Sequence, residues 1–217
     1  DQGGYFESVG VSRDDLRRGE MYRSNLRRES SRADFADYGE YLRSLDMHAE
    51  IRPFEALYFQ RITQLTNKTN QFNLTTRRYT QDEIRLCAED PDVISLWGRL
   101  SDRYGDNGLV SVLIARRQDD ALDIELFLMS CRVLKRGMEQ AMITALASAA
   151  GAQGGIRTLR GRYLPTPKNA MVRELYGTLG FTLVSAAADG SSLWELPLDS
   201  FRPLPCAIAV NGAPLPL

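Results

Sequence analysis

A short basic turn gathers several side chains that could take part in chemistry. The stretch SCRVLKRG spans residues 130–137 and links an apolar run to a helix-forming run. A helix N-terminus offers unpaired N–H groups and the positive end of the helix dipole, and nearby cations would add charge-assisted hydrogen bonds to a bound phosphate. The alternative is a solvated basic turn after a core strand. The candidate phosphate-binding residues are Arg132, Val133, Lys135, Arg136 and Gly137.

The same turn contains a candidate nucleophile, Cys131. A positive helix end and an adjacent arginine favour the thiolate form of a cysteine, and a thiolate could accept an acyl group transiently before passing it to a carrier. The apolar neighbours Leu128 and Met129 indicate the alternative, which is a buried and inert cysteine at the end of a strand.

A second candidate region is the amide-rich stretch TNKTNQFN, residues 66–73. Its side chains could line the acceptor side of a cleft and hydrogen-bond a small hydroxyacyl group. They could equally build a turn at the end of a helix, because asparagine tolerates the left-handed region of backbone conformation. Both interpretations stay open. The candidate substrate-binding residues are Asn67, Asn70, Gln71 and Asn73.

The composition excludes several classes of function. The 27 basic and 28 acidic residues give a net charge of -1, which argues against a general nucleic-acid-binding protein. No apolar run reaches the length of a membrane span. His48 is the only histidine, so we expect neither a histidine-based triad nor a metal centre. Three scattered cysteines give no disulfide framework, and we expect a cytoplasmic protein.

The candidate side chains must be positioned by a mixed set of helices and strands. The charged front section predicts a long helix over 12–32, capped by Ser12, and a shorter one over 35–45, capped by Asp34. Further along, alternating and apolar stretches predict strands, and 3.6-residue periodicity predicts helices. The body has predicted strands at 47–53, 109–117, 121–130 and 156–165, helices that start near Thr80 and Met138, the latter ending near Gly151, a helix over 168–179, and a final hairpin across Asp189–Gly190.

This order predicts an α+β (α/β) fold with a mixed, mostly antiparallel twisted sheet flanked by helices. The runs 109–117 and 121–130 would pair antiparallel, and the helix over 137–151 would form one parallel crossover. For the Pro-rich residues 201–217 we expect a surface strap or a disordered end. The opening DQGGYFES has the character of a linker, so we expect a fragment of a longer protein.

The second half of this order resembles the GNAT acetyltransferase fold. The family's pyrophosphate loop has the pattern Q/R-x-x-G-x-G/A, which the turn matches at Arg132 and Gly137. It departs from the pattern at Lys135, where the family has glycine. The lysine adds a cation, but its side chain could crowd the close backbone approach that glycine permits. The family's later N…LY…GF helix is matched by Asn169, Leu175, Tyr176, Gly180 and Phe181.

Longer blocks resemble the C-terminal half of FkbH-like proteins, in which a HAD-type phosphatase domain (subfamily IIIC) precedes a GNAT-like domain. The blocks are QLTNKTNQFNLTTRRYT, RYGDNGLVSV, IELFLMSCRVLKRGMEQAM and YLPTPKNAMVRELYGTLGF, and the opening GGYFESVGVSRDDLRRGEMYRS resembles the end of the HAD domain. This resemblance implies a helical linker and the end of a missing HAD domain over 1–46, a GNAT-like acyltransferase domain over 47–200, and a Pro-rich tail over 201–217.

The resemblance implies acyltransferase activity. FkbH-like proteins load a glyceryl unit derived from 1,3-bisphosphoglycerate onto an acyl carrier protein for polyketide biosynthesis. The implied cofactor is carrier-bound phosphopantetheine or coenzyme A, and the implied partners are the carrier protein and the missing HAD domain, with no nucleic acid and no membrane. A CoA-dependent N-acyltransferase and a non-catalytic carrier-docking module are the alternatives, because a GNAT-like domain that lacks one loop glycine could be degenerate.

Three further residues take their candidate roles from this resemblance. Tyr176 stands where many GNAT enzymes keep a tyrosine that protonates the leaving thiolate, and a phenol suits that role. The alternative is that Tyr176 packs its helix onto the sheet. Glu125 falls where family members have an acid, which could act as a general base through water or simply be solvated. Asn169 opens the later motif and is assigned to cofactor binding.

Overall fold

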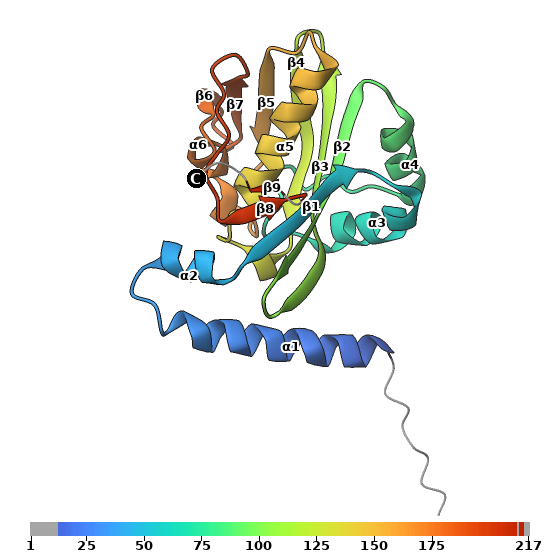
Figure 1. Cartoon of the computed structure of the whole chain (residues 1–217). Coiled ribbons are helices and arrows are strands. Elements are labelled where there is room, and N and C mark those ends of the chain that lie inside the picture. The colour runs from blue at the N-terminus through green and yellow to red at the C-terminus, as the bar shows by residue number, and fades with distance from the viewer. Residues whose placement is uncertain (1–12, 212, 215–217) are drawn as a thin grey trace, which may run out of the picture.

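The described strands form one continuous sheet. The computed structural model describes residues 13–211, 213 and 214. Within these residues, nine strands hydrogen-bond in the order β6-β7-β5-β4-β3-β2-β1-β8-β9 (Figure 1). The strands are β1 (Met47–Pro53), β2 (Val93–Asp102), β3 (Gly105–Gln118), β4 (Ala121–Met129), β5 (Thr158–Tyr163), β6 (Thr182–Ala186), β7 (Ser192–Pro197), β8 (Ile208–Val210) and β9 (Ala213–Pro214).

Helices cover both faces of this sheet. Helix α5 lies across one face, α3 and α4 lie on the other, and α1 and α2 lie at one end of the strands (Figure 1). The helices are α1 (Arg13–Arg32), α2 (Tyr38–Ser44), α3 (Phe59–Lys68), α4 (Gln81–Glu89), α5 (Met138–Gln153) and α6 (Leu175–Thr178), with 3-10 helices η1 (Ala56–Tyr58), η2 (Cys131–Val133) and η3 (Ala170–Val172).

The sheet is mixed and mostly antiparallel, as predicted. Strands β3 and β4 pair antiparallel, and the β4–α5–β5 unit makes the predicted parallel crossover. Strand β4 is apolar throughout its second half because both faces are covered. Phe127 and Met129 belong to the core beneath α5, whereas Leu126 and Leu128 belong to the core beneath α3 and α4. This packing fixes where β4 ends and the basic turn begins.

Two predicted helix boundaries are wrong. Helix α2 begins at Tyr38, because Asp37 rather than Asp34 is its N-cap: the Asp37 carboxylate accepts a hydrogen bond from the Glu40 backbone N–H at 2.8 Å. Helix α5 continues through Gly151 and stops only at Gly154, whose φ of +71° breaks the helical conformation. By contrast, α4 begins where predicted, and its N-cap Thr80 forms a full capping box with Glu83.

Two C-terminal segments also differ from their predictions. The expected helix over 168–179 is two short helices, η3 and α6. The reason is that the Asn169 side chain stabilises a turn, in which its Oδ1 accepts a hydrogen bond from the Thr166 backbone N–H at 2.7 Å. The tail 201–217, expected as a strap or a disordered end, contributes strand β8, which pairs parallel with β1. Residues 208–210, 213 and 214 of the tail are therefore part of the sheet, and residues 212 and 215–217 lie outside the described residues.

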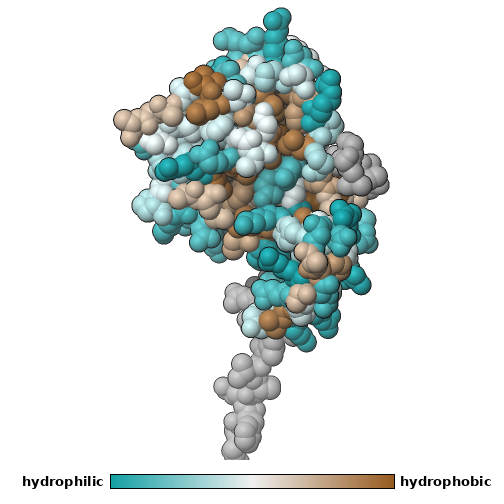
Figure 2. Space-filling view, turned by 90° about the vertical axis from the view of Figure 1, so that its left-hand side faces the viewer, coloured by the Kyte–Doolittle hydropathy of each residue, from teal (hydrophilic) through white to brown (hydrophobic). Residues whose placement is uncertain are grey.

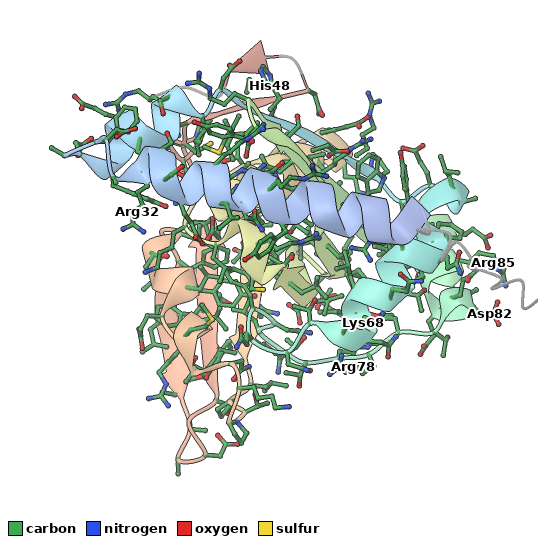
Figure 3. The ribbon with its side chains drawn as sticks, turned by 90° about the horizontal axis from the view of Figure 1, so that it is seen from below. Arg32, His48, Lys68, Arg78, Asp82 and Arg85 are labelled. Atoms are coloured by element: carbon green, nitrogen blue, oxygen red, sulfur yellow. The ribbon has the colours of Figure 1, made fainter. Side chains whose placement is uncertain are left out.

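The front helices pack on the body. Seen from below, α1 runs across the end of the sheet (Figure 3). Arg28 of α1 is buried and binds the Asp102 carboxylate with two hydrogen bonds of 2.7 and 2.8 Å. Ser12, the predicted cap of this helix, lies outside the described residues. Among the described helices, none combines the length and apolar character that crossing a bilayer requires.

Strands β4 and β5 diverge, and a short segment fills the space between them. Their pairing stops at Ile124 and Gly161. Beyond that point the segment 72–74 lies between them: the Leu74 N–H donates to the Phe127 carbonyl at 3.2 Å, and the Leu74 carbonyl accepts from Leu164 at 2.8 Å. The segment 72–74 therefore completes the sheet where its central parallel pair opens.

Candidate functional site

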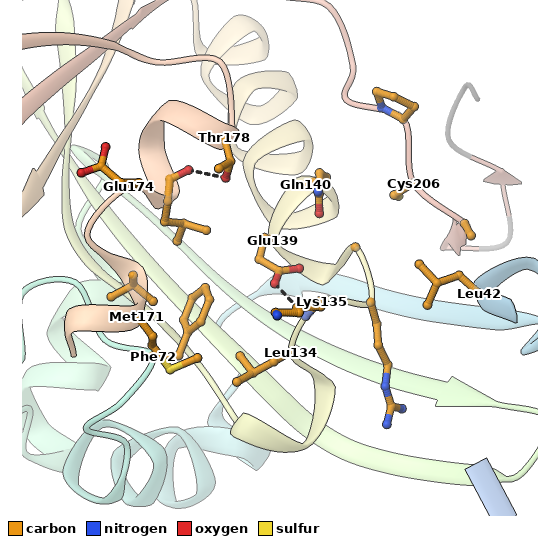
Figure 4. A pocket seen from close by; sticks show the side chains of 16 residues that line it. Leu42, Phe72, Leu134, Lys135, Glu139, Gln140, Met171, Glu174, Thr178 and Cys206 are labelled. Carbon is orange, nitrogen blue, oxygen red and sulfur yellow. Dashed lines mark hydrogen bonds between the residues drawn. The ribbon is translucent and has the colours of Figure 1, made fainter. Parts of the chain in front are cut away.

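A pocket of about 460 Å³ lies beside the start of α5. Its walls come from five parts of the chain: α2, the end of the basic turn with the first turn of α5, helices η3 and α6, the tail 205–207, and Phe72 of the segment 72–74 (Figure 4). The volume is typical of a site for a small ligand. Most side chains that line it are apolar or carry long aliphatic stems, among them Leu42, Phe72, Leu134, Met171, Val172 and Leu175.

The basic turn has an unusual backbone. Lys135 has φ +60° and Gly137 has φ +94°, so two residues of this turn occupy the left-handed region. A Cβ at Gly137 would lie 2.9 Å from Cβ of Cys206 in the tail, so glycine is required there for close approach as well as for conformation. Lys135 takes the conformation that glycine adopts readily, which explains why a glycine suits this position in the GNAT pattern.

The cations of the turn differ in how free they are to meet a ligand in the pocket, which Lys135 and Arg136 line and Arg132 does not. Arg136 pairs with the buried Asp102 at 3.3 Å, and burial lowers the pKa of its guanidinium. Arg132 donates to the Ser130 hydroxyl at 3.1 Å, and burial lowers its pKa as well. Lys135 is exposed and lines the pocket. Of the three predicted phosphate-binding cations, only Lys135 is an exposed residue at the pocket.

An acidic side chain from the first turn of α5 lies against the basic turn. Glu139, in the first turn of α5, is 7% exposed, and its Oε1 accepts a hydrogen bond from the Lys135 backbone N–H at 3.2 Å. Burial raises the pKa of Glu139, and this effect exceeds the lowering by the backbone N–H groups of Glu139, Lys135 and Gly137. The other carboxylate oxygen is buried and has no hydrogen-bond partner within residues 13–211, 213 and 214, and the same holds for Oε1 of the neighbouring Gln140.

Tyr176 and Asn169 lie in the core rather than on the pocket wall. Tyr176 is fully buried, its ring lies directly against Gly161 of β5, and its hydroxyl has no hydrogen-bond partner in the part of the chain that the structure describes. Burial raises its pKa above the usual range. Asn169 is also fully buried and donates to the carbonyls of Asn73 and Leu164, both at 2.9 Å. This placement favours the packing alternative for Tyr176, and it gives Asn169 a role in holding the segment 72–74.

Cys131 and Glu125 lie away from the pocket as well. Cys131 is exposed at the start of η2 and is not among the lining residues, so the buried alternative does not hold for it. Glu125 is on β4, where it pairs with Arg77 at 2.9 Å and Arg116 at 3.2 Å and accepts a hydrogen bond from the Tyr79 hydroxyl. Its carboxylate is therefore already engaged on the face of the sheet that α3 and α4 cover.

The amide-rich stretch mostly builds local structure. Asn67 donates to the carbonyls of Thr63 and Tyr79, and Asn70 accepts from Arg78. Asn73 is fully buried, and its side chain bonds to the backbone of the same stretch. Gln71 is exposed. The turn-building alternative therefore describes Asn67, Asn70 and Asn73, and the contribution of this stretch to the pocket is the ring of Phe72.

The sequence interpretation missed several residues of the pocket. Glu139 and Gln140 were overlooked because an acid in the first turn of a helix is ordinary. The signal in the sequence was the position of Glu139, a carboxylate two residues after Gly137 and next to a turn that carries only positive charge. The tail residue Cys206 could not be placed from sequence, since nothing local marks 208–210 as a partner of β1. Among the described residues, no cluster of His, Cys, Asp or Glu could hold a metal ion.

Known proteins share this architecture. No protein-family model and no curated protein sequence matches the chain. The ribosomal-protein-S18-alanine N-acetyltransferase from Escherichia coli superimposes with a TM-score of 0.51 at 14% identity, over 69% of this chain and 94% of that chain. The GNAT domain of S. lividans PAT gives 0.52 at 16% identity, over 68% and 89%. This chain has the GNAT acetyltransferase fold.

A third GNAT-fold neighbour was solved with ligands. It is the spermidine N-acetyltransferase from Vibrio cholerae in complex with CoA and spermine, with a TM-score of 0.52 at 10% identity, over 70% of this chain and 96% of that chain. That enzyme binds coenzyme A. At such identities the likeness concerns the fold, so the activity of the present chain must be argued from its own GNAT-fold pocket.

Proposed function

We propose that this chain is an acyltransferase domain whose pocket receives a phosphopantetheine arm, carried by an acyl carrier protein or by coenzyme A. The observation that carries the proposal is the apolar pocket of about 460 Å³ against the first turn of α5. A phosphopantetheine arm is a long and narrow chain that is uncharged along its pantetheine part and ends in a phosphate. An apolar pocket with one exposed lysine at its edge fits that distribution of polarity.

The residues present fit the two ends of such an arm unequally. Phe72, Leu134 and Met171 offer apolar surface for the chain of the arm. At the phosphate end, Lys135 is an exposed cation, but the amide groups of the turn already face the Glu139 carboxylate. The site therefore favours the arm itself over a ligand with several phosphates.

The finer proposal is glyceryl transfer to an acyl carrier protein, as the C-terminal part of an FkbH-like loading enzyme. It is supported by the sequence blocks that resemble that family and by a pocket suited to the arm. When bound, the arm supplies the thiol that carries the acyl group as a thioester. Cys131, Tyr176 and Glu125 stay candidates for acyl transfer and proton transfer, although none of them lines the pocket. The carrier protein, a HAD domain on the same polypeptide and the cytoplasm stay predictions.

The second candidate is a CoA-dependent N-acyltransferase. It is favoured by the fold neighbours, which include N-acetyltransferases for a protein N-terminus and for spermidine. This function requires acyl-CoA turnover with an amine acceptor and without any carrier protein. A domain that only docks a carrier protein would bind the arm and turn over nothing.

A calorimetric titration with pantetheine, coenzyme A and a phosphopantetheinylated carrier protein tests the proposal. Met171 lines the pocket and is 55% exposed, so Met171→Trp fills the pocket without disturbing the core. We expect this variant to bind each ligand at least tenfold more weakly. The matched control is Leu183→Trp on β6, at 48% exposed and outside the pocket lining, which should bind as the wild type does. Wild-type protein that binds none of the three would overturn the proposal.

A further inference from the structure

The first turn of α5 places an acidic side chain of the protein itself, Glu139, against the basic turn. The Lys135 N–H donates to Glu139 Oε1 at 3.2 Å, and the backbone N–H groups of Gly137 and Glu139 act to lower the pKa of this carboxylate, although burial raises that pKa overall. We call these three N–H groups the amide cradle. A helix N-terminus with converging N–H groups is the kind of place that binds a phosphate. Here the acceptor is Glu139.

The carboxylate is held in an environment that does not satisfy it. Glu139 is only 7% exposed, and its Oε2 has no hydrogen-bond partner among the described residues. Both Glu139 and Gln140 line the pocket, and Figure 4 shows the Glu139 carboxylate hydrogen-bonded to Lys135. A buried acceptor without a donor is costly. This orphaned oxygen at the pocket is the observation that points to a ligand or a proton there.

We propose that Glu139 is a specificity-determining residue that fills the amide cradle, so that the pocket accepts a pantetheine arm but takes the pyrophosphate of coenzyme A only when Glu139 is protonated. The proposal rests on the proposed function for the pocket and deepens it. It favours an arm attached to a carrier protein, whose single phosphate can stay at the exposed rim near Lys135.

The physical reason is repulsion between like charges in a buried place. A pyrophosphate seated on the amide cradle would meet an ionised carboxylate in a region of low polarity, where such repulsion is strong. Few other charges face Glu139 to offset it. From the turn there are Lys135 and Arg136, of which Arg136 is paired with Asp102; from the η3–α6 region there is Glu174; from the tail there is the Cys206 thiol, whose pKa burial and the nearby Glu139 raise.

A proton therefore accompanies coenzyme A into the site. Burial already raises the pKa of Glu139, and a bound anion would raise it further. Affinity for coenzyme A should increase as the pH falls, by up to about tenfold per pH unit while the carboxylate is ionised in the free protein. Affinity for pantetheine, which carries no charge, should not change.

The experiment compares wild-type protein with Glu139→Gln. The glutamine amide keeps the shape of the carboxylate and an acceptor for the cradle, but it removes the charge. Calorimetric titrations at pH 6 and pH 8 use pantetheine, coenzyme A and inorganic pyrophosphate as probes. We expect Glu139→Gln to bind coenzyme A and pyrophosphate at least tenfold more tightly than wild type at pH 8, with equal affinity for pantetheine, and to gain less affinity for coenzyme A than wild type does between pH 8 and pH 6.

The matched control is Glu55→Gln, which removes an exposed carboxylate outside the pocket lining. It should bind all three probes as the wild type does. Equal binding of coenzyme A by wild type and Glu139→Gln at pH 8 would overturn the inference, as would pyrophosphate binding to neither protein at either pH. Pantetheine binding to neither protein, with the pyrophosphate difference intact, would instead reject the proposed function and leave the inference standing.

A second measurement covers the case in which Glu139→Gln does not fold. Titration of the wild type with coenzyme A in buffers of different ionisation enthalpy reports proton uptake directly. Uptake approaching one proton per coenzyme A near pH 8 supports the inference. Binding without proton uptake, at the same affinity at pH 6 and pH 8, overturns it.

Discussion

At the scale of single residues, the most informative side chain is Tyr176. A sequence motif predicts a role for Tyr176, but it does not predict the buried environment of the side chain. The Tyr176 ring lies against Gly161, where any Cβ would come within 2.3 Å of the ring, so the two residues depend on each other. Its hydroxyl is buried without a partner. A buried hydroxyl in this state contributes nothing to stability and costs the free energy of its lost hydration.

The first prediction separates the two roles of Tyr176. In Tyr176→Phe the orphaned hydroxyl is removed, so the free energy of unfolding should stay constant or rise by about 1 kcal/mol. If Tyr176 is the acid for the leaving thiolate, acyl transfer should fall by about a hundredfold or more. If it only packs, transfer should be unchanged. Urea unfolding and a single-turnover transfer assay on the same protein distinguish these outcomes.

Tyr163→Phe is the control for this comparison. Tyr163 is equally buried, but its hydroxyl donates to Asn169 at 3.3 Å. Its loss should lower the free energy of unfolding by about 1 kcal/mol, because it leaves an acceptor with one donor fewer. Greater destabilisation by Tyr176→Phe than by Tyr163→Phe would mean that the Tyr176 hydroxyl has a partner after all.

The residue scale also shows what the sequence can predict. The left-handed turn at Lys135 and Gly137 is anticipated in part by a glycine in a loop pattern. The ion pair of Arg136 cannot be anticipated in this way, because its partner Asp102 is 34 residues away in sequence, at the end of β2. A cluster of cations in a sequence predicts positive charge in a region, whereas the partners that neutralise it come from the tertiary fold.

At the scale of elements, the segment 72–74 is the feature that local patterns describe least well. The periodicity of α3, the capping box of α4 and the apolar strands β3 and β4 are all visible in the sequence, since each depends on neighbours within a few residues. The segment 72–74 depends on β4, on Leu164 and on Asn169, which are distant in sequence. An amide-rich stretch is therefore compatible with both interpretations until the fold is known.

The second prediction concerns this segment. Asn169→Asp replaces the amide group that donates to the carbonyls of Asn73 and Leu164, and it places an acid in a fully buried position. The free energy of unfolding should fall by about 3 kcal/mol or more. Hydrogen exchange should become faster at the amide groups of Leu74 and Met129, which bond across the segment.

Asn67→Asp is the matched control. Asn67 also donates its side-chain amide to two backbone carbonyls, but it is exposed, so water can replace the lost hydrogen bonds. Its cost should stay within about 1 kcal/mol, and exchange at Leu74 should not change. Similar losses in both variants would show that Asn169 does not hold the segment.

At the scale of the whole molecule, α1 is tied to the GNAT-fold body by one buried ion pair. Arg28 binds Asp102, and Arg136 from the basic turn binds the same carboxylate. The helix is therefore linked through Asp102 to the start of α5 and hence to the pocket. A sequence without an alignment cannot reveal this link, because the charged helix 12–32 has many arginines of equal appearance.

The third prediction tests that link. Arg28→Met keeps the aliphatic stem of the arginine and removes its charge, which leaves Asp102 buried with only Arg136 as a cationic partner. The free energy of unfolding should fall by about 3 kcal/mol. Arg99→Met, which removes an exposed pair with Asp106, should cost at most about 1 kcal/mol.

Limited proteolysis of both variants gives a second readout for this third prediction. Helix α1 should be cleaved faster in Arg28→Met than in the wild type, while Arg99→Met should match the wild type. Equal stability losses in the two variants, or unchanged cleavage of α1, would contradict the view that the Arg28–Asp102 pair holds the helix in place.

The tail has a consequence for the order in which the pocket is assembled during synthesis. Residues 205–207 line the pocket, and β8 right after them pairs with β1, about 160 positions earlier in the chain. A ribosome releases β1 to β7 before any of these residues, so a nascent chain can build most of the sheet while the pocket still lacks one wall. The proposed ligand should therefore find a complete pocket only after β8 has emerged and docked.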